Sequence, residues 1–392
     1  MSQLSGRLSD FWNRIQGSLL FFLEEELDPL TEKQKQLVAI LELIRLEEFL
    51  PNYFQREGRP QKDRSAIARS FVAKTVYNLD STRALLDRLD SDKNLRRICG
   101  WESKGFIPSE STFSRAFTEF AESALPGQVH DALIKETLGD KIIPHNSRDS
   151  TAVEGWEKPL SKKVQEETIQ GSSENTSRKK RKKGRPKKGE KQVVPEPTRI
   201  EKQLNMTLEE MLEDLPKHCD VGGKKDSKGN TMFWHGYKLH LDTIDACIPV
   251  SALLTSASVH DSQVAIPLAT LTSNKITNLY DLMDSAYDIE GIHKHSKSLG
   301  HVPLIDVNPR RNKEMKRDME AEAKARRTLN WKSPEALRYN ERTTAERANA
   351  RLKDEFGARK VKVRGHKKVG CHLMFGVLVL AADQIIKLAM QA

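Results

Sequence analysis

Four residues near the C-terminus have types and a spacing that could do chemistry: Tyr339, Arg342, Glu346 and Lys353. Their offsets from Tyr339 are 3, 7 and 14, which at about 100° per residue fall within a sector of roughly 60° on an α-helix. One helix face would then carry a phenol, a guanidinium, a carboxylate and an ammonium. A lone carboxylate flanked by cations suits a divalent metal ion beside phosphate. The alternative is a charged helix whose Glu–Lys neighbours are solvated pairs.

Two aspartates that follow strand-like runs are the candidates to complete such a site. A two-metal phosphoryl-transfer site needs about three carboxylates from different elements. Asp149 ends the run KIIPHNSRD and Asp284 ends NLYDLMD, so neighbouring strand ends could bring them together beneath a helix that carries Glu346. Asp281 and Asp288 are alternatives to Asp284, but the first precedes the last apolar pair of the run and the second lies beyond the expected strand end. For any single aspartate, capping a turn is the commoner role.

Composition and charge limit the class of protein. The chain has 392 residues, of which 37% are hydrophobic and 31% charged, so it can bury at least one sizeable core and is long enough for two. The net charge is +10, and the run from Arg178 to Lys191 alone carries +9, leaving +1 for the other 378 residues. The basic character is therefore concentrated in one segment.

Disulfide scaffolds, zinc fingers and membrane spans are not expected. The four cysteines, Cys99, Cys219, Cys247 and Cys371, are far apart and form no CxxC pair, which fits a reducing compartment. The first residues lack the charged and then apolar order of a signal peptide. The most apolar run, Leu373 to Ala382, is too short to cross a bilayer. We expect a soluble, intracellular protein, with no membrane and no small-molecule substrate among its partners.

The first third of the chain predicts a helical domain. From about Asp28 to Gly139 the apolar residues recur with helical period almost throughout, as in TEKQKQLVAILELIRLEEFL. Asp63 is a suitable acidic cap for a helix that reaches Leu79.

Within this region, the stretch GWESKGFIPSESTFSRAFTEFA suggests a DNA-reading helix. A turn leads to Ser109 or Ser111 as an N-cap, and the helix then carries Thr112, Ser114 and Arg115 near its start. Short polar side chains and an arginine at the start of a second helix are typical of a helix-turn-helix reader. An ordinary helical hairpin in a bundle is the alternative.

Residues 160 to 200 change character, because they are rich in Lys, Arg, Ser, Glu and Pro and almost free of large apolar residues. Such a composition predicts a disordered linker or insertion. Its KGRPKK sequence, with Arg185 and Lys187, resembles an AT-hook that lies in the minor groove of A/T-rich DNA. The alternative is a basic tail that binds polyanions without preference.

From Trp234 onward the pattern predicts a mixed sheet covered by helices. GYKLHLDTID and IPVSALLTSASVHD read as two strands in series, and NLYDLMD, IEGIHKHSKSLG and HVPLIDVNP read as strand, helix and strand. A charged helix, the helix with Glu346, and a final apolar helix follow. The fold class expected is α+β or α/β.

These residues together resemble a known family. The pattern Y-x2-R-x3-E-x6-K with Glu346 as its glutamate, together with RDSTAVEG, LMDSAYD and the strands between them, is similar to the bacterial insertion-sequence DDE transposases. The helical segment DRSAIARSFVAKTVYNLDSTRALLDRL is similar to the domain that precedes the catalytic core in that family. The resemblance covers roughly residues 30 to 390. The 61 residues between Asp284 and Glu346 read as charged helix, so the large β-insertion of some members is absent or reduced.

The resemblance implies a ribonuclease-H-like mixed-sheet catalytic domain behind an N-terminal all-helical DNA-binding domain. We expect residues 1–140 to form the helical domain, 141–159 the first catalytic strand, 160–220 a basic disordered insertion, and 221–392 the remainder of the catalytic domain. It also implies that Asp149, Asp284 and Glu346 bind the metals, and that Tyr339, Arg342 and Lys353 contact DNA phosphates near the cleaved end.

The chemistry of the residue types agrees with this expectation. Three carboxylates without His or Cys are hard ligands that favour two Mg²⁺ ions, with Mn²⁺ as a substitute. Arg342 suits bidentate phosphate contact and Lys353 a point-charge contact. The run from Arg359 to Lys368 has six Lys or Arg and no acid, so Arg364 and Lys367 could follow a DNA backbone.

The function expected is therefore metal-dependent cleavage and strand transfer of insertion-sequence ends. The partners would be double-stranded DNA of the terminal repeats and of the target, held by a homodimer so that both ends are processed together. A metal-dependent nuclease of the same fold, or a domesticated DNA-binding protein that lacks catalysis, is the alternative. An RNA-binding helical protein is a weaker one, because aromatic stacking runs are missing.

Overall fold

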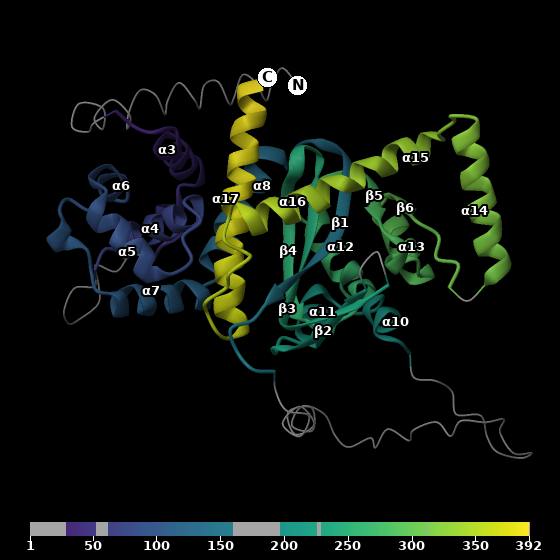
Figure 1. Cartoon of the computed structure of the whole chain (residues 1–392), viewed down its shortest axis with the longest axis horizontal. Helices are drawn as coiled ribbons and strands as arrows, with labels where there is room; N and C mark the ends of the chain where they lie inside the picture. The colour runs from purple at the N-terminus through teal and green to yellow at the C-terminus, as the bar shows by residue number, and fades with distance from the viewer. Residues whose placement is uncertain (1–28, 52–61, 160–196, 226–228, 311, 392) are drawn as a thin grey trace, which may run out of the picture.

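The computed structural model describes residues 29–51, 62–159, 197–225, 229–310 and 312–391. It consists of a helical region followed by a mixed α/β sheet domain (Figure 1). Arg185 and Lys187 of the predicted minor-groove arm lie outside the described residues. The elements of the helical region are α3 (Glu32–Ile44), η1 (Leu46–Phe49), α4 (Arg64–Val76), α5 (Thr82–Ser91), α6 (Lys93–Ile98), η3 (Lys104–Phe106), α7 (Glu110–Glu122) and α8 (Leu125–Leu138).

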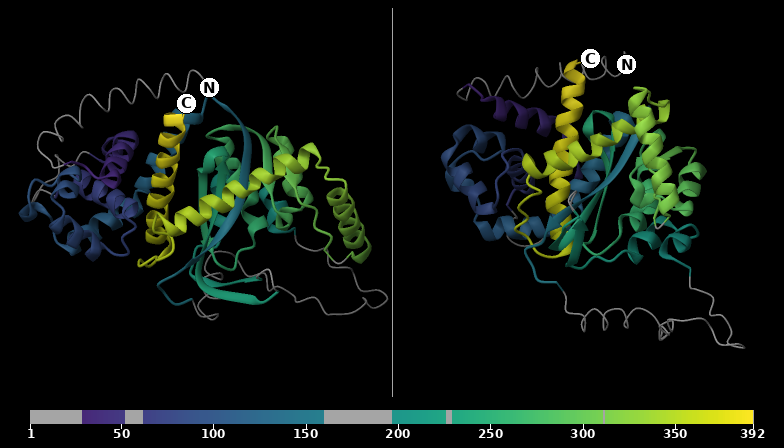
Figure 2. Two further views of the ribbon diagram at one scale, coloured as in Figure 1. Left: turned by 45° about the horizontal axis from the view of Figure 1, so that its top comes forward. Right: turned by 45° about the vertical axis from the view of Figure 1, so that its right-hand side comes forward.

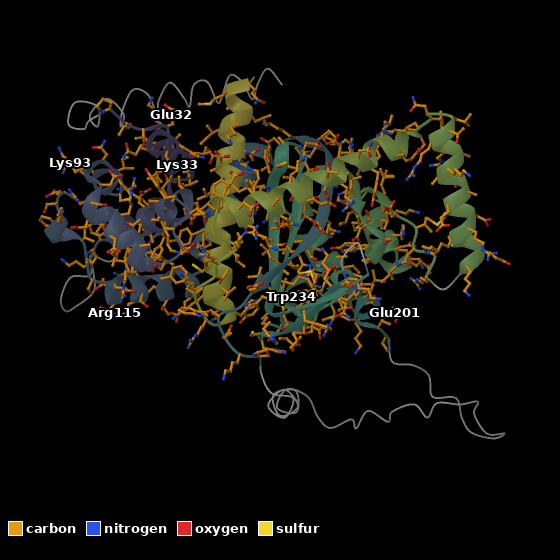
Figure 3. The ribbon with its side chains drawn as sticks, viewed as in Figure 1. Glu32, Lys33, Lys93, Arg115, Glu201 and Trp234 are labelled. Carbon is orange, nitrogen blue, oxygen red and sulfur yellow. The ribbon has the colours of Figure 1, made fainter. Side chains whose placement is uncertain are left out.

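Most helices of this region begin at residues that can cap them, and two of these N-caps, Asp63 and Ser109, were predicted. The side chain of Asp63 accepts hydrogen bonds from the backbone nitrogens of Ser65 and Ala66, which confirms the acidic cap of α4. Ser109 is the N-cap of α7, but its hydroxyl bonds to that of Ser111 rather than to the backbone. Arg115 is exposed on the outer side of α7 (Figure 3).

The connection between α6 and α7 runs from residue 99 to residue 109. A helix-turn-helix unit usually has a turn of about 3–4 residues, so this connection is longer than the pattern assumed. The start of α7 is exposed and therefore accessible to DNA. Sequence reading by this helix stays a prediction.

The sheet has the mixed topology that the sequence predicted. Its strands are β1 (Ile142–Glu154), β2 (Asp220–Lys225), β3 (Thr231–Ile244), β4 (Ile248–Ser256), β5 (Thr277–Met283) and β6 (Val302–Ile305). β3 pairs antiparallel with β1, β5 pairs parallel with β1, and β6 pairs parallel with β5. β2 and β4 pair antiparallel with successive parts of β3. This arrangement is consistent with the ribonuclease-H-like core that the resemblance implied.

One expectation about β1 was wrong. The sequence placed Asp149 at the end of a short strand, whereas β1 continues to Glu154 and Asp149 pairs with Leu241 on β3. The strand continues because the residues after Asp149 keep their partners on β3 as far as Gly236. Gly236 has φ +147°, and a Cβ there would lie 2.2 Å from the carbonyl oxygen of Val153, so only glycine permits this close approach of the two strands.

Helices cover both faces of the sheet (Figures 1 and 2). One face is crossed by the helical run α15–η7–α16, and the other faces α12 and the network around Asp242. The helices after β1 are α10 (Arg199–Gln203), α11 (Leu208–Asp214), η4 (Asp245–Cys247), η5 (Asp261–Val264), α12 (Ala265–Ser273), η6 (Ser285–Tyr287), α13 (Glu290–Ser298), α14 (Lys313–Thr328), α15 (Pro334–Tyr339), η7 (Asn340–Arg342), α16 (Thr343–Asp354) and α17 (His366–Gln391).

The last part of the segment predicted as a basic insertion, residues 197–220, contains structured elements. α10 and α11 each begin with a capping box, from Thr198 with Glu201 and from Thr207 with Glu210. Ile200 and Met211 are buried in a small apolar cluster beside α12. These local signals lie among the polar residues that gave the segment its disordered appearance.

Helix α17 joins the two parts of the protein. It packs against α3, α4, α7 and α8 on one side and against β4 and α16 on the other (Figure 1). A Cβ at Gly376 would lie 2.8 Å from Leu352 Cδ1, so glycine lets α16 cross closely. By length and composition α17 could span a membrane, but 61% of its apolar window is buried in the protein, as in a core helix. All four cysteines are free and buried.

Candidate active site

The parallel pairing of β1 and β5 brings two of the predicted acids side by side. Ser147 is paired with Leu282 at the end of the ladder. Two residues farther along each strand lead to Asp149 and Asp284, and adjacent strands are about 4.8 Å apart. Residues two apart on a strand share a face, so Asp149 lies on the same face as Ser147, which is the face covered by α16.

Asp149 lies between strand and helix. One of its carboxylate oxygens, Oδ2, accepts a hydrogen bond of 3.0 Å from Nδ2 of Asn349, a buried residue of α16. Burial raises the pKa of Asp149, and the negative charge of Asp284 raises it further, whereas hydrogen bonds from the Ser150 backbone and Asn349 and the attraction of Arg342 oppose the rise. The two aspartates therefore lie close enough to repel each other, as two acids poised around a cation would.

Asp284 also has the capping role that was the alternative for any aspartate. It is the N-cap of η6, and its Oδ1 accepts a hydrogen bond of 2.9 Å from the backbone nitrogen of Ala286. This bond fixes the carboxylate at the end of β5. The rival Asp281 points into the buried interior, where it is 1% exposed and accepts hydrogen bonds from Ser296 and Asn278.

The residues of the Y-R-E-K pattern lie on a helical run that changes type. Tyr339 ends α15, Arg342 ends the 3₁₀ turn η7, and Glu346 lies in the first turn of α16. Side chains three apart are eclipsed in a 3₁₀ turn, so Tyr339 and Arg342 remain neighbours, with the guanidinium 5.7 Å from the ring centroid.

Hydrogen bonds join the segment that precedes α16 to β1 and to the end of β5. The hydroxyl of Ser147 on β1 donates to the carbonyl oxygen of Glu341 at 3.1 Å. The Tyr339 hydroxyl lies 3.2 Å from the carbonyl oxygen of Met283 and 2.7 Å from Oδ2 of Asp306. Tyr339 thus positions the helix beside Asp284. Burial and the Asp306 carboxylate raise its pKa above the ordinary value.

Glu346 is held by a cation in this structure. Its Oε1 forms an ion pair of 2.6 Å with Arg342, whose side chain is 22% exposed while that of Glu346 is 51% exposed. Burial alone would lower the pKa of Arg342, but Tyr339, Glu346 and Asp149 raise it. The positive charge of Arg342 is therefore stabilised by two of the three predicted carboxylates, Glu346 and Asp149.

Lys353 lies apart from this group. It is seven residues after Glu346, roughly 10 Å along the helix, and its neighbours include Arg359, Lys224 and Glu154. Burial and the two nearby cations lower its pKa. The pattern therefore does not form one compact site. Tyr339 contacts Met283 beside Asp284, and Glu346 is held by Arg342. Lys353 lies among other charges, those of Arg359, Lys224 and Glu154.

The donor chemistry suits a hard divalent ion, but the present geometry does not enclose one. Among the described residues, no three His, Cys, Asp or Glu side chains lie close enough together to hold a metal ion. The buried hydroxyl of Tyr287 has no hydrogen-bond partner, and its pKa is raised by burial and then by Asp261, Asp149 and Asp284. Negative charge is thus concentrated here. Asp261, however, forms an ion pair of 3.0 Å with Lys238.

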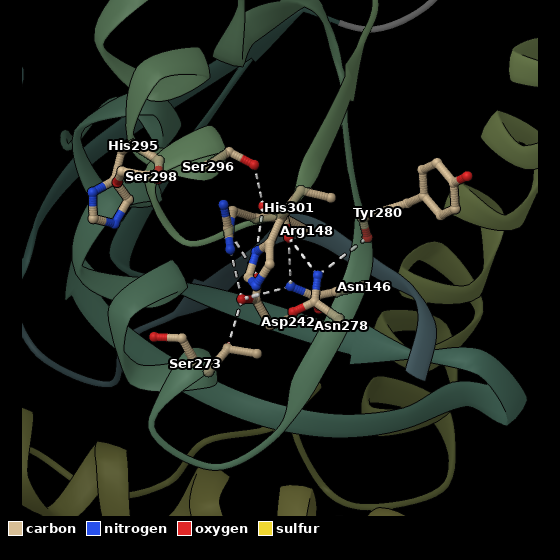
Figure 4. A network of polar contacts seen from close by, with 12 residues as sticks. Asn146, Arg148, Asp242, Ser273, Asn278, Tyr280, His295, Ser296, Ser298 and His301 are labelled. Atoms are coloured by element: carbon tan, nitrogen blue, oxygen red, sulfur yellow. Dashed lines mark hydrogen bonds and ion pairs between the residues drawn. The ribbon is translucent and has the colours of Figure 1, made fainter. Parts of the chain in front are cut away.

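A buried polar network lies behind the aspartates and was not foreseen (Figure 4). Arg148, next to Asp149, forms a bidentate ion pair with Asp242 on β3, with distances of 2.7 and 2.6 Å, and its Nη1 lies 3.3 Å from the sulfur of Met283. Both members of the pair are buried. The pair therefore connects β1, β3 and β5 at the residues adjoining Asp149 and Asp284.

The same network holds Asp281. His301 Nδ1 lies 3.1 Å from Asp281. Burial would raise the pKa of Asp281, but the hydrogen bond from His301 and the attraction of Arg148 lower it to about 2. The sequence signal for these residues is their position: Asn146, Arg148, Asp242 and Asp281 are polar side chains inside predicted strands.

The predicted DNA-tracking run lies on the surface between the helical region and the sheet domain. Lys360 forms an ion pair of 2.9 Å with Asp80, and Arg359 pairs with Asp354. Arg364 Nε donates to the carbonyl oxygen of Trp156 at 3.0 Å. Lys367 is exposed.

Comparison with known proteins gives two family matches. Residues 205–381 match the family described as transposase DDE domain, and residues 24–119 match the family described as transposase domain (DUF772). The first match contains Asp284 and Glu346 and begins after Asp149, so the place of Asp149 depends on the strand geometry. No curated protein and no solved structure matches the chain.

Proposed function

The chain belongs to the insertion-sequence DDE transposases, and we propose that it cuts the ends of a DNA element and joins them to target DNA. The observation that supports this proposal is the parallel pairing of β1, which carries Asp149, with β5, which Asp284 directly follows, together with the hydrogen bond from Asn349 of α16 to Asp149. Carboxylates from a strand, from the residue after a neighbouring strand and from a helix can together hold the metal ions that phosphoryl transfer requires.

In this proposal Asp149, Asp284 and Glu346 hold divalent metal, with Mg²⁺ preferred and Mn²⁺ as a substitute, because all three ligands are hard oxygens. Bound metal would activate the attacking water or 3′-hydroxyl and stabilise the leaving oxygen. Asp149 lies on β1 and Asp284 directly follows the neighbouring strand β5. Glu346 completes the set by leaving Arg342, to which it is bonded at 2.6 Å.

The release of Arg342 would serve a second purpose. A guanidinium without its carboxylate partner can bind a DNA phosphate through two hydrogen bonds. Tyr339 supports this exchange, since its ring lies against Arg342 and its hydroxyl fixes the chain to β5 and to Asp306. Lys353 would contact a phosphate farther from the scissile bond.

Other cations are proposed to hold the DNA on either side of the site. Arg364 and Lys367 would contact backbone phosphates, and Arg185 and Lys187 the minor groove. A homodimer would hold two element ends and the target together in the bacterial cytoplasm. These contacts are charge-based, so binding should weaken steeply as salt rises.

The proposed function is tested with a labelled linear DNA that carries both flanking ends of the element. Wild-type protein with Mg²⁺ is expected to nick the ends and to join them to a second DNA, and EDTA should abolish both products. Cleavage without joined products would indicate a nuclease of the same fold. Specific binding with no metal-dependent product would indicate a DNA-binding protein and contradict the proposal.

Replacing Asn349 by alanine is expected to lower the cleavage rate by roughly 10- to 100-fold, the usual effect of losing a residue that orients a metal ligand. The reason is the hydrogen bond of 3.0 Å from Asn349 to Asp149. The matched control is Asn340→Ala, since Asn340 is exposed on η7. Equal rates for the two variants, measured on the same labelled ends, would show that Asn349 does not position Asp149.

A further inference from the structure

A basic cleft is lined by residues of α4, α7 and the first turns of α17, together with the start of α5 and Trp156 after β1. Helices α4 and α7 pack against α17 (Figure 1). Its volume is about 420 Å³, within the range of roughly 300–1,000 Å³ typical of ligand clefts. The charged side chains that line it are four cations, Lys74, Lys362, Arg364 and Lys368, and two acids, Asp80 and Glu110. We call it the basic cleft.

The acids of the basic cleft already have partners. Asp80 is paired with Lys360 at 2.9 Å, a residue outside the lining, and Glu110 lies 3.6 Å from Arg83. Of the four lining cations, only Lys362 forms an ion pair with one of these acids, at 3.9 Å from Asp80, so positive charge is in excess. The first turn of α5 also faces the cleft through Ser81 and Thr82, and helix N-termini favour anions. Charge and helix direction together indicate an anionic occupant.

Lys74 gives the strongest indication of a missing partner. It lies on α4 and is 9% exposed, and its ammonium makes no hydrogen bond or ion pair with the described residues. Burial lowers its pKa to about 8, an effect that Asp80 opposes and Lys362 reinforces. An unpaired buried ammonium destabilises a fold unless a ligand neutralises it.

Trp156 adds an aromatic surface beside these cations. Its ring is 56% exposed, and the guanidinium of Arg364 lies 5.5 Å from the ring. The position is fixed, because the Trp156 carbonyl oxygen accepts from Arg364 and the neighbouring Glu157 carboxylate accepts from the backbone nitrogen of Gly365 at 3.1 Å. Exposed aromatic rings beside cations are the usual means of binding unpaired bases.

We propose that the basic cleft binds one nucleotide of unpaired DNA, with its phosphate against Lys74 and Lys368 and its base stacked on Trp156. The choice of DNA as the ligand rests on the proposed function. The site itself is a separate one, because Lys74, Lys368 and Trp156 are not part of the proposed metal site. The cleft would hold a single-stranded flank that cleavage exposes.

The test is binding without chemistry. A fluorescein-labelled single-stranded 12-mer and a duplex of the same length are titrated with the full chain in EDTA, and anisotropy gives the dissociation constants. Trp156→Leu is expected to weaken single-strand binding by about 5- to 100-fold, since stacking is worth about 1–3 kcal/mol per base, and duplex binding by less than about 3-fold. Trp156→Phe should retain most of the affinity.

Trp331 provides a matched control. It is 54% exposed and lies 5.6 Å from the guanidinium of Arg326, so it resembles Trp156 in everything except the cleft. Trp331→Leu should change neither constant. A Trp156→Leu variant that binds the single strand as tightly as wild type would overturn the proposal. The proposal would also be overturned if the wild-type protein bound polyglutamate of the same charge as tightly as it binds the single strand.

Lys74→Met separates a binding role from a structural one. Removal of an unpaired buried charge should raise the melting temperature, while the slope of log affinity against log salt for the single strand should fall by about 0.7, the value for one phosphate contact. A lower melting temperature with an unchanged slope would contradict the proposal. The binding test is run without metal, so it can succeed even if the protein does not cleave DNA. Equally, cleavage at the acidic site can succeed even if the basic cleft does not bind the single strand.

Discussion

Replacing Asp149 or Asp284 by asparagine, or Glu346 by glutamine, is expected to lower the rate of end cleavage by roughly 1,000-fold or more. Metal ions supply several kcal/mol of stabilisation to such a transition state, and about 4 kcal/mol corresponds to a factor of roughly 1,000. An amide keeps the size of the side chain but loses the charge that binds a cation. DNA binding in EDTA should persist, because these residues are not among the proposed phosphate contacts.

The controls for these variants are exposed acids of nearby elements, Asp318→Asn on α14 and Glu335→Gln on α15. Both should cleave at the wild-type rate. Rates are measured on one labelled end at saturating Mg²⁺, with melting curves to show that each variant is folded. An Asp284→Asn variant that cleaves within a few-fold of wild type would remove Asp284 from the site and reopen the choice among neighbouring acids.

The second large effect is expected in stability. Arg148→Met should lower the free energy of unfolding by about 3–5 kcal/mol, because it leaves Asp242 buried and without its ion-pair partner. Asp242→Asn should have a comparable effect. Burial would lower the pKa of Arg148, but the charge of Asp242 and its hydrogen bonds with Arg148 raise it. Urea denaturation measures the change.

The double variant distinguishes pairing from mere burial. Arg148→Met combined with Asp242→Leu removes both charges, and buried pairs replaced by apolar residues are often near neutral. It should therefore be more stable than either single variant. Arg317→Met, an exposed arginine on α14, should change stability by less than about 0.5 kcal/mol. A double variant with strictly additive losses would show that the pair is not coupled.

The parts of the fold that were predicted correctly depend on local signals. Asp63 caps α4, β3 and β5 follow the alternating and apolar runs, and α17 follows the last apolar segment. Each of these depends on periodicity or capping within a few residues. The transposase family was also identified from short motifs, and the family matches confirm it.

The parts that were missed depend on contacts between distant residues. Asp149 lies within β1 rather than at its end because β3, about 90 residues later, supplies the pairing partners. The bond from Asn349 to Asp149 joins residues 200 positions apart. The ion pair of Glu346 with Arg342 lies within one helical run, but its importance appears only when the positions of Asp149 and Asp284 are known.

The predicted single face of Tyr339, Arg342, Glu346 and Lys353 illustrates the same limit. Regular α-helical spacing places all four together, whereas the run contains the 3₁₀ turn η7 and Lys353 meets the far end of β1. The basic cleft was also invisible in the sequence, since Lys74, Trp156 and Lys368 come from three separate segments. The sequence shows which residue types are present, but only the fold shows which of them lie close together.

The central claim is that Asp149, Asp284 and Glu346 bind the metal, and the most direct test changes the ligand at one of them. Asp284→Cys presents a thiolate, a poor ligand for Mg²⁺ that softer ions accept better. We predict no end cleavage by this variant with Mg²⁺ and partial recovery with Mn²⁺ or Zn²⁺, while Asp284→Ser stays inactive with every ion. Cleavage by Asp284→Cys at the wild-type rate with Mg²⁺ would contradict the account.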